Sequence, residues 1–168
     1  TKPLGIGILT TAEKQGKLAS EHQRLATDTM CLSNRIGSEL AYQHGVHALT
    51  DVTGFGLLGH LLEMCQGAGV GAEIHWSSLP MLDGVAACIA AGAVPGGCER
   101  NFTAYGHQVA TLTDLERSVL CDPQTSGGLL IAAAAEAAGV VSAQLAEAGL
   151  HAEPIGQLTP APAGQAII

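Results

Sequence analysis

Short apolar segments of strand length alternate along this chain with longer segments of helical period. Such an alternation is typical of a sheet with helices packed against it. The pattern predicts strands over residues 4–9, 46–50, 70–75, 129–134 and 153–158, and helices over residues 20–43, 57–67, 80–92, 114–120 and 136–148. Ser20 and Gln23 have the spacing of a capping box for the first of these helices. Residues 93–113 show no clear period and are expected to form a long loop.

The length of the chain, 168 residues, suits one compact domain with a single core. We expect this domain to cover residues 1–158, and residues 159–168, which contain Pro160, Pro162 and Gly164, to form a frayed tail. Hydrophobic residues make up 47% of the chain but aromatic residues only 3%, so the core must consist of aliphatic side chains. The chain opens on an apolar segment without an initiator Met, which indicates a domain cut from a longer protein.

The charge of the chain argues against a nucleic-acid partner and against an anionic membrane surface. Fifteen acidic residues against seven scattered basic residues give a formal net charge of −8. No apolar stretch reaches the roughly 20 residues that a membrane span needs, and no secretion signal opens the chain. We therefore expect a cytoplasmic protein.

The cysteines do not indicate a metal site or a disulfide framework. The five are widely spaced, without a CxxC pair or zinc-finger spacing. Cys31, Cys65 and Cys88 fall inside apolar helical segments, where a cysteine is usually a small buried hydrophobic residue.

Asp51 is the first candidate for chemistry, because it stands where a predicted strand ends and Gly54, Gly56 and a helix follow. A carboxylate in that place faces solvent, Gly54 and Gly56 let a ligand approach the backbone closely, and the following helix N-terminus favours phosphate. Mg²⁺ bound by one or two carboxylates and substrate phosphates would fit this arrangement. The alternative is that Asp51 caps its own turn and the glycines only permit a tight bend.

The second candidate is the polar turn from Asp122 to Gly128, which places an acid, an amide and two hydroxyls before a very apolar strand. The alternative is a structural turn in which Thr125 and Ser126 bond their own backbone. Arg100 and Asn101 could also reach an anion, or form a solvated surface. No nucleophile and base stand together, so these residues alone give a weak metal or phosphate site and no complete catalytic set.

Several strings resemble the C-terminal domain of the selenophosphate synthetases (selenide, water dikinases). They are Thr1–Gly7 (TKPLGIG), Thr50–His60 (TDVTGFGLLGH), Pro95–Gly97, Arg100–Asn101 and Asp122–Leu130 (DPQTSGGLL). The likeness covers residues 1–158, and two of the strings are long and specific. Aminoimidazole ribonucleotide (AIR) synthetase, thiamine monophosphate kinase and a hydrogenase maturation factor, of the same superfamily, carry looser versions.

The resemblance implies an α+β domain, a mixed and largely antiparallel sheet layered with helices. It implies a two-domain enzyme that converts ATP, selenide and water to selenophosphate, AMP and phosphate. ATP and metals lie between the two domains, and Asp51 takes the position of the aspartate that binds Mg²⁺. Thr53, Asn101, Gln124, Thr125 and Ser126 belong to matching strings without an assigned role.

The family's catalytic Cys or selenocysteine, its Lys and its glycine-rich segment belong to the N-terminal half, which this chain lacks. No catalytic residue is therefore assigned here, and we expect the chain to be inactive alone and the full-length protein to form a homodimer through the other half. Two further hypotheses are kept: another kinase or synthetase of the superfamily, and a domain that binds without catalysis.

Overall fold

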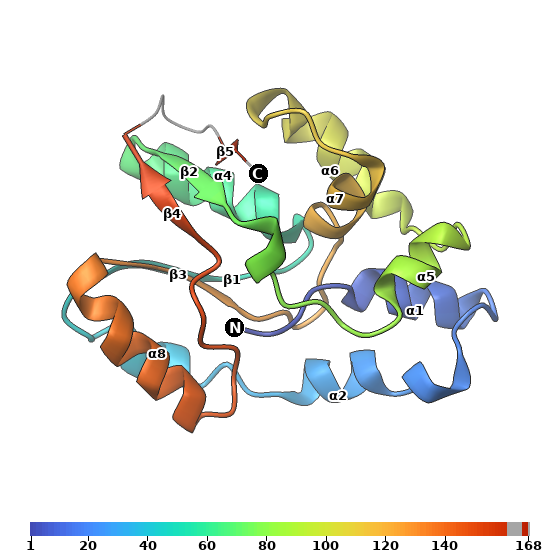
Figure 1. The fold of residues 1–168 in the computed structure, drawn as a ribbon, viewed down its shortest axis with the longest axis horizontal. Coiled ribbons are helices and arrows are strands. Elements are labelled where there is room, and N and C mark those ends of the chain that lie inside the picture. The colour runs from blue at the N-terminus through green and yellow to red at the C-terminus, as the bar shows by residue number, and fades with distance from the viewer. Residues whose placement is uncertain (161–165, 168) are drawn as a thin grey trace.

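The computed structural model describes residues 1–160 and 166–167, with strands in two small sheets (Figure 1). In the first, β1 (Val46–Asp51) pairs antiparallel with β3 (Leu129–Ala133), and Asp51 lies opposite Leu129. In the second, β2 (Gly71–Ile74) pairs antiparallel with β4 (Gly156–Thr159) and parallel with β5 (Ala166–Ile167). The predicted α+β class with a mixed, largely antiparallel arrangement is confirmed.

Helices cover these sheets and enclose an aliphatic core. They are α1 (Ile6–Lys14), α2 (Leu25–Cys31), α3 (Ile36–Leu40), α4 (Gly56–Ala68), α5 (Val85–Ala90), α6 (Gly96–Tyr105), α7 (Asp114–Leu120) and α8 (Ala138–Glu147). The main core gathers fully buried side chains such as Ile8, Leu58 and Leu120, while a smaller cluster under α8 holds Leu40 and Val141. None of the helices in the described part of the chain is long and apolar enough to cross a bilayer. The cytoplasmic location stays a prediction.

Most of the predicted elements are confirmed within a few residues, and α7 has the predicted limits. Its start is encoded locally: Thr113 accepts a hydrogen bond from the Glu116 backbone, and the Glu116 carboxylate accepts one from the Thr113 backbone. This capping box needs no distant partner, so the sequence alone indicates it.

The strand predicted over residues 4–9 is wrong, because α1 begins at Ile6 and Leu4 makes only an isolated bridge to Met81. The first N–H groups of α1 are satisfied by side chains that follow more than a hundred residues later. Gly7 N and Ile8 N donate to the carboxylate of Asp122 over 3.0 and 3.3 Å. A distant acid thus supplies the cap that the local sequence lacks.

The continuous helix predicted over residues 20–43 is also wrong. A 3-10 turn at Ser20–His22, α2 and α3 replace it, and the Ser20 hydroxyl contacts Glu21 instead of capping a helix. The chain is extended at Leu32, which lets the Asn34 side chain donate to Gly127 O over 2.8 Å. A tertiary contact therefore overrides the helical period.

Three smaller predictions need correction. Residues 93–113 are not a long loop, because α6 occupies Gly96–Tyr105, and the helix expected from Pro80 begins at Val85. Cys31 is exposed, whereas Cys65 and Cys88 are buried as expected.

The predicted boundary at residue 158 and the frayed tail stay predictions. Residues 161–165 and 168 lie outside the described part, and Ala166–Ile167 forms β5.

Candidate functional site

The Asp51 loop, residues 51–56, joins β1 to α4. Of the segments that the sequence offers as candidate sites, it is the most exposed. Asp51 and Gly54 are exposed, and the Phe55 side chain is 63% exposed. A Cβ on Gly54 would meet nothing within 4 Å. A ligand can therefore approach the backbone at Gly54, as the sequence predicted.

Gly56 has a different function from the one predicted for it. Its φ is +69°, and a Cβ there would come within 2.8 Å of the Cys121 carbonyl carbon. Glycine is needed here for close packing against the chain that follows α7, not for access of a ligand.

Backbone and side-chain groups hold the loop from behind. Val52 N donates to Gly128 O over 2.8 Å, and Gln124 N donates to Thr53 O over 2.9 Å. Thr53 N donates to His60 Nε2 over 3.0 Å, so that nitrogen is an acceptor and the ring proton belongs on Nδ1. The exposed face of the loop is thus carried on a fixed frame.

Two residues of α6 complete this frame. The buried amide of Asn101 donates to both Gly54 O and Cys121 O, over 2.9 and 3.0 Å. The hydroxyl of Tyr105 donates to Phe55 O over 2.6 Å. Asn101 therefore links the Asp51 loop to Cys121, the residue directly before the polar turn, and so brings together two segments that are distant in the sequence.

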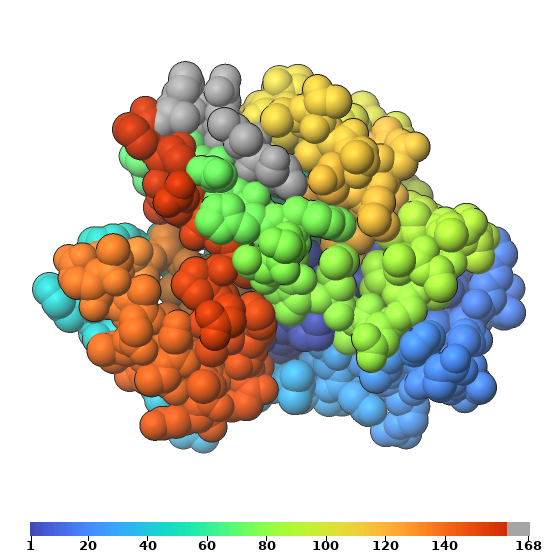
Figure 2. Space-filling view, viewed as in Figure 1, coloured from blue at the N-terminus to red at the C-terminus, as the bar shows by residue number. Residues whose placement is uncertain are grey.

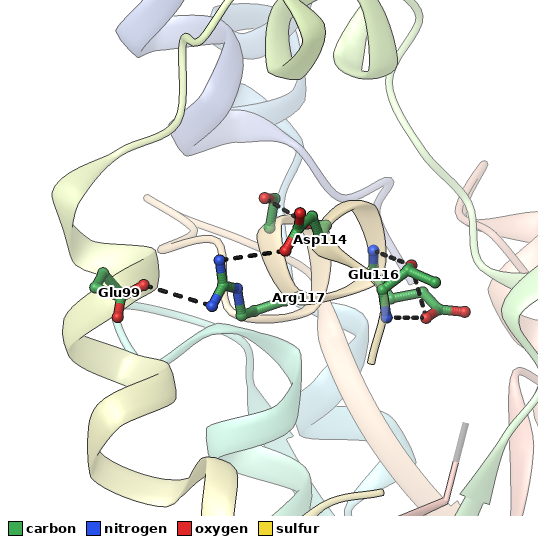
Figure 3. A network of polar contacts seen from close by, with 6 residues as sticks. Glu99, Asp114, Glu116 and Arg117 are labelled. Atoms are coloured by element: carbon green, nitrogen blue, oxygen red, sulfur yellow. Dashed lines mark hydrogen bonds and ion pairs between the residues drawn. The ribbon is translucent and has the colours of Figure 1, made fainter. Parts of the chain in front are cut away.

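Figure 3 shows the ion pair between Glu99 and Arg117 that joins α6 to α7. Arg117 of α7 lies 3.8 Å from the Glu99 carboxylate and 3.5 Å from Asp114, and its guanidinium lies 5.3 Å from the centre of the Phe102 ring. The acids are well exposed, so each ion pair adds little stability, about 0–1 kcal/mol. Only the pair with Glu99 joins α7 to α6, the helix that carries Asn101, because Asp114 and Arg117 both belong to α7.

The start of the polar turn is structural. Asp122 is fully buried, and its carboxylate accepts hydrogen bonds from α1 and from Gln124 Nε2, the last over 2.7 Å. The side-chain oxygen Oε1 of Gln124 accepts a further hydrogen bond from Ile6 N over 3.3 Å. Burial raises the pKa of Asp122 to about 7, although the bonds from Gln124, Ile8 and Gly7 act in the opposite direction. The polar atoms of Asp122 and Gln124 are used inside the protein.

The end of the polar turn lies at the surface. Thr125 and Ser126 are exposed, and Ser126 has a φ of +51°. The Ser126 hydroxyl donates to Met30 O over 2.9 Å, while its carbonyl accepts from Lys2 Nζ over 2.8 Å. Arg100 is exposed on α6, next to the buried Asn101.

The described residues fit one ligand of a magnesium ion but do not make a site. No group of three or more His, Cys, Asp or Glu side chains that could hold a metal is found in the part of the chain that the structure describes. Mg²⁺ is often held by one or two carboxylates, several waters and substrate phosphates. The exposed carboxylate of Asp51 suits one of these positions, and the other ligands have to come from elsewhere.

Sequence reasoning thus found Asp51, Thr53, Asn101 and Gln124, which the structure gathers around one loop. It missed His60 and Tyr105 as supports of that loop. His60 could have been found, because it lies only seven residues after Thr53, near the start of α4, the helix that follows the loop.

The chain matches the family described as AIR synthase related protein, C-terminal domain, over residues 1–168, and it belongs to that family. It is 56% identical over all 168 residues to the selenide, water dikinase of Yersinia pseudotuberculosis serotype I (strain IP32953), of which it covers 48%. The predicted resemblance is confirmed. The chain spans about half the length of the curated relatives it matches.

Solved structures support the fold. The thiamine-monophosphate kinase of Stenotrophomonas maltophilia K279a superposes with a TM-score of 0.65 at 18% identity, over 99% of this chain and 48% of that chain. Hydrogenase maturation protein HypE in complex with ATP superposes with a TM-score of 0.55 at 19% identity, over 99% of this chain and 45% of that chain. At this identity the likeness establishes the fold.

Proposed function

We propose that this chain is the C-terminal half of a selenide, water dikinase. The full-length protein would convert selenide, ATP and water to selenophosphate, AMP and phosphate. The observation that carries the proposal is the 56% identity over the whole chain to a protein of that name. The exposed Asp51 loop, held on a fixed frame, supports it.

In this proposal the Asp51 loop faces the N-terminal half and completes an ATP and magnesium site between the halves. The Asp51 carboxylate supplies one ligand of the ion. The magnesium ion, when bound, neutralises charge on the phosphates. The frame made by Asn101, His60 and Tyr105 holds the backbone that follows Asp51 in place before the substrate binds, so less order has to be created in the loop at binding.

The chain alone would be inactive, and its cysteines support this part of the proposal. Cys65, Cys88, Cys98 and Cys121 are buried, and burial raises the pKa of the Cys98 thiol to about 12, so no thiolate forms there at neutral pH. Cys31 is exposed and lies at the end of α2. The nucleophile and the remaining metal ligands are assigned to the N-terminal half, through which the full-length protein would dimerise.

Substitution of Asp51 with asparagine in the full-length protein tests the metal assignment. Selenide-dependent AMP formation should fall by about a hundredfold or more, because a charge that stabilises the reacting phosphates through the metal is lost. Asp83→Asn, which removes another exposed carboxylate, is the matched control and should leave the rate unchanged. Circular dichroism establishes that both variants are folded.

A folded Asp51→Asn protein with the rate of the Asp83→Asn protein would contradict the assignment of Asp51 to the metal. A rate that recovers at high Mg²⁺ concentration would support it, since a missing ligand weakens magnesium binding.

A further inference from the structure

A groove of about 510 Å³ separates the two sheets of this domain. Leu129–Ala133 of β3 line one side of the groove, and Gly156–Leu158 of β4 line the other. Val141 and Leu145 of α8 close one end. In Figure 2 this region lies between the orange residues of α8 and the red and green residues of β4 and β2. Most residues that line the groove are apolar, yet one of its walls is an edge of the strand β3.

The backbone of β3 presents hydrogen-bonding groups to this groove, and those of Ile131 and Ala133 have no partner among the residues that the structure describes. Gly128 O accepts a hydrogen bond from Val52 N, and Ala134 N donates one to Gly45 O. The backbone groups of Gly128 and Ala134 therefore point toward β1. Because the direction of N–H and C=O alternates along a strand, the groups of Leu129, Ile131 and Ala133 point the other way, into the groove. Buried backbone groups without partners are costly, so this edge is suited to pair with another strand.

Thr1 already occupies the beginning of that edge. Its amine donates to Leu129 O over 3.0 Å, and its hydroxyl accepts from Leu129 N over 2.7 Å. On the other side, His151 N donates to Thr1 O over 2.9 Å, in the segment that leads into β4. Thr1 therefore lies between β3 and the segment before β4, and Figure 1 places the N-terminus in the middle of the molecule.

The direction of the chain at Thr1 is opposite to that of β3. Lys2 lies against Gly128, since a Cβ on Gly128 would come within 2.3 Å of Lys2 N, and Thr1 lies against Leu129. Residues before Thr1 would consequently pass Leu130, then Ile131, and continue toward Ala133, along the groove.

We propose that the residues directly before Thr1 in the full-length protein form a β-strand in this groove, antiparallel to β3 and beside β4, which joins the two sheets into one. The proposal rests on the proposed function only in requiring that the chain continues upstream, as the twofold greater length of its relatives implies. About four residues before Thr1, at about 3.4 Å each, would cover Leu130–Ala133. The added strand would connect the N-terminal half to β3, whose partner β1 ends in Asp51.

Hydrogen exchange in the full-length protein, resolved by residue, measures whether the groove edge is paired. The amides of Leu130 and Ala132 point toward β1 and are protected in either case. If a strand fills the groove, Ile131 and Ala133 exchange within about tenfold of them. Exchange of Ile131 and Ala133 more than about a hundredfold faster would overturn the proposal.

Disulfide scanning identifies the occupant. In full-length protein carrying Cys31→Ser, Ile131→Cys is combined with a single cysteine at each of the five residues before Thr1, and linked peptides are detected by mass spectrometry after mild oxidation. Cross-linking should occur at alternate positions, because alternate side chains of the added strand share a face with residue 131. Val140→Cys, an exposed position of α8 that does not line the groove, is the control and should link to none.

Protected amides without any cross-link, or equal yields with Val140→Cys, would mean that β4 or a second copy of the chain covers the edge, and the proposal would be wrong. Neither readout involves ATP or selenide. A protein that cross-links with period two but forms no selenophosphate would support this inference and refute the proposed function, and the reverse result would do the opposite.

Discussion

Replacing Asp122 with asparagine tests whether a buried acid controls the pH dependence of stability in this half of the protein. The side chain is fully buried at the N-terminus of α1, where one carboxylate oxygen accepts hydrogen bonds from Gly7 N, Ile8 N and Gln124 Nε2. The carbonyl oxygen of asparagine can accept the same three bonds. The substitution therefore removes the ionisable group and keeps the cap.

The magnitude follows from the pKa in the two states. Burial raises the pKa of Asp122 from 3.8 to about 7, which makes folding less favourable by about 4 kcal/mol once the group is ionised in both states. Between these two pKa values the folded protein binds more protons than the unfolded chain. The stability from this group is thus fully present at low pH and is lost as the pH rises through 7.

Urea unfolding of the full-length protein at a series of pH values measures this effect. The free energy of unfolding of Asp122→Asn minus that of wild type should rise by about 4 kcal/mol between pH 4 and pH 8. This corresponds to a shift of about 2 M between the urea midpoints of the two proteins. Asp83→Asn, which alters the net charge at an exposed position, is the control. A difference between Asp122→Asn and wild type that is the same at every pH would refute the reasoning.

Three further predictions concern packing and exposure. Asn101→Leu leaves Gly54 O and Cys121 O without a donor and should lower the free energy of unfolding by about 2–4 kcal/mol in urea; a loss below about 0.5 kcal/mol would show that these bonds are dispensable. Gly127→Ala should be strongly destabilising in thermal unfolding, since its Cβ would come within 2.2 Å of Val52 O, whereas Gly139→Ala in open space on α8 should gain up to about 1 kcal/mol. Equal melting temperatures for the two alanine variants would contradict this packing. Of the cysteines in this half, only Cys31 should react with a thiol reagent in the native protein, and modification of the other four without unfolding would contradict their burial.

The elements that could be predicted from the sequence are those whose signals are local. α7 carries its own capping box, and the strand β3 is a continuous apolar run that follows a glycine-rich turn. α1 was not predictable in this way, because its cap, Asp122, is 115 residues from Gly7 in the sequence. An apolar run with two glycines then has the pattern of a strand, and only the tertiary contact decides for a helix.

α6 was missed for a related reason. Pro95 and two glycines at its start are typical of a loop, but Gly97 is needed because a Cβ there would meet Pro123 at 2.5 Å. The helix forms because it packs against the turn that follows α7 and inserts Asn101 between that turn and the Asp51 loop.

The candidate site was predictable in part. The exposed position of Asp51 follows from a strand that ends at a glycine-rich turn, and the structure confirms that position. The function of Asp122 and Gln124 was not predictable, because a polar turn before a buried strand looks the same whether it binds a ligand or caps a distant helix. Burial separated the two cases: Asp122 and Gln124 are inside, and Thr125 and Ser126 are at the surface.

Phosphorus NMR of the full-length protein with ATP, Mg²⁺ and selenide identifies the reaction products. We expect selenophosphate, AMP and phosphate in equal amounts, all dependent on selenide, and at least about a hundredfold slower formation with Asp51→Asn but not with Asp83→Asn. The proposed function would be contradicted if no selenophosphate formed with selenide, and if ADP formed with thiamine monophosphate or with an aminoimidazole precursor. That result would assign the protein to another activity of the same superfamily.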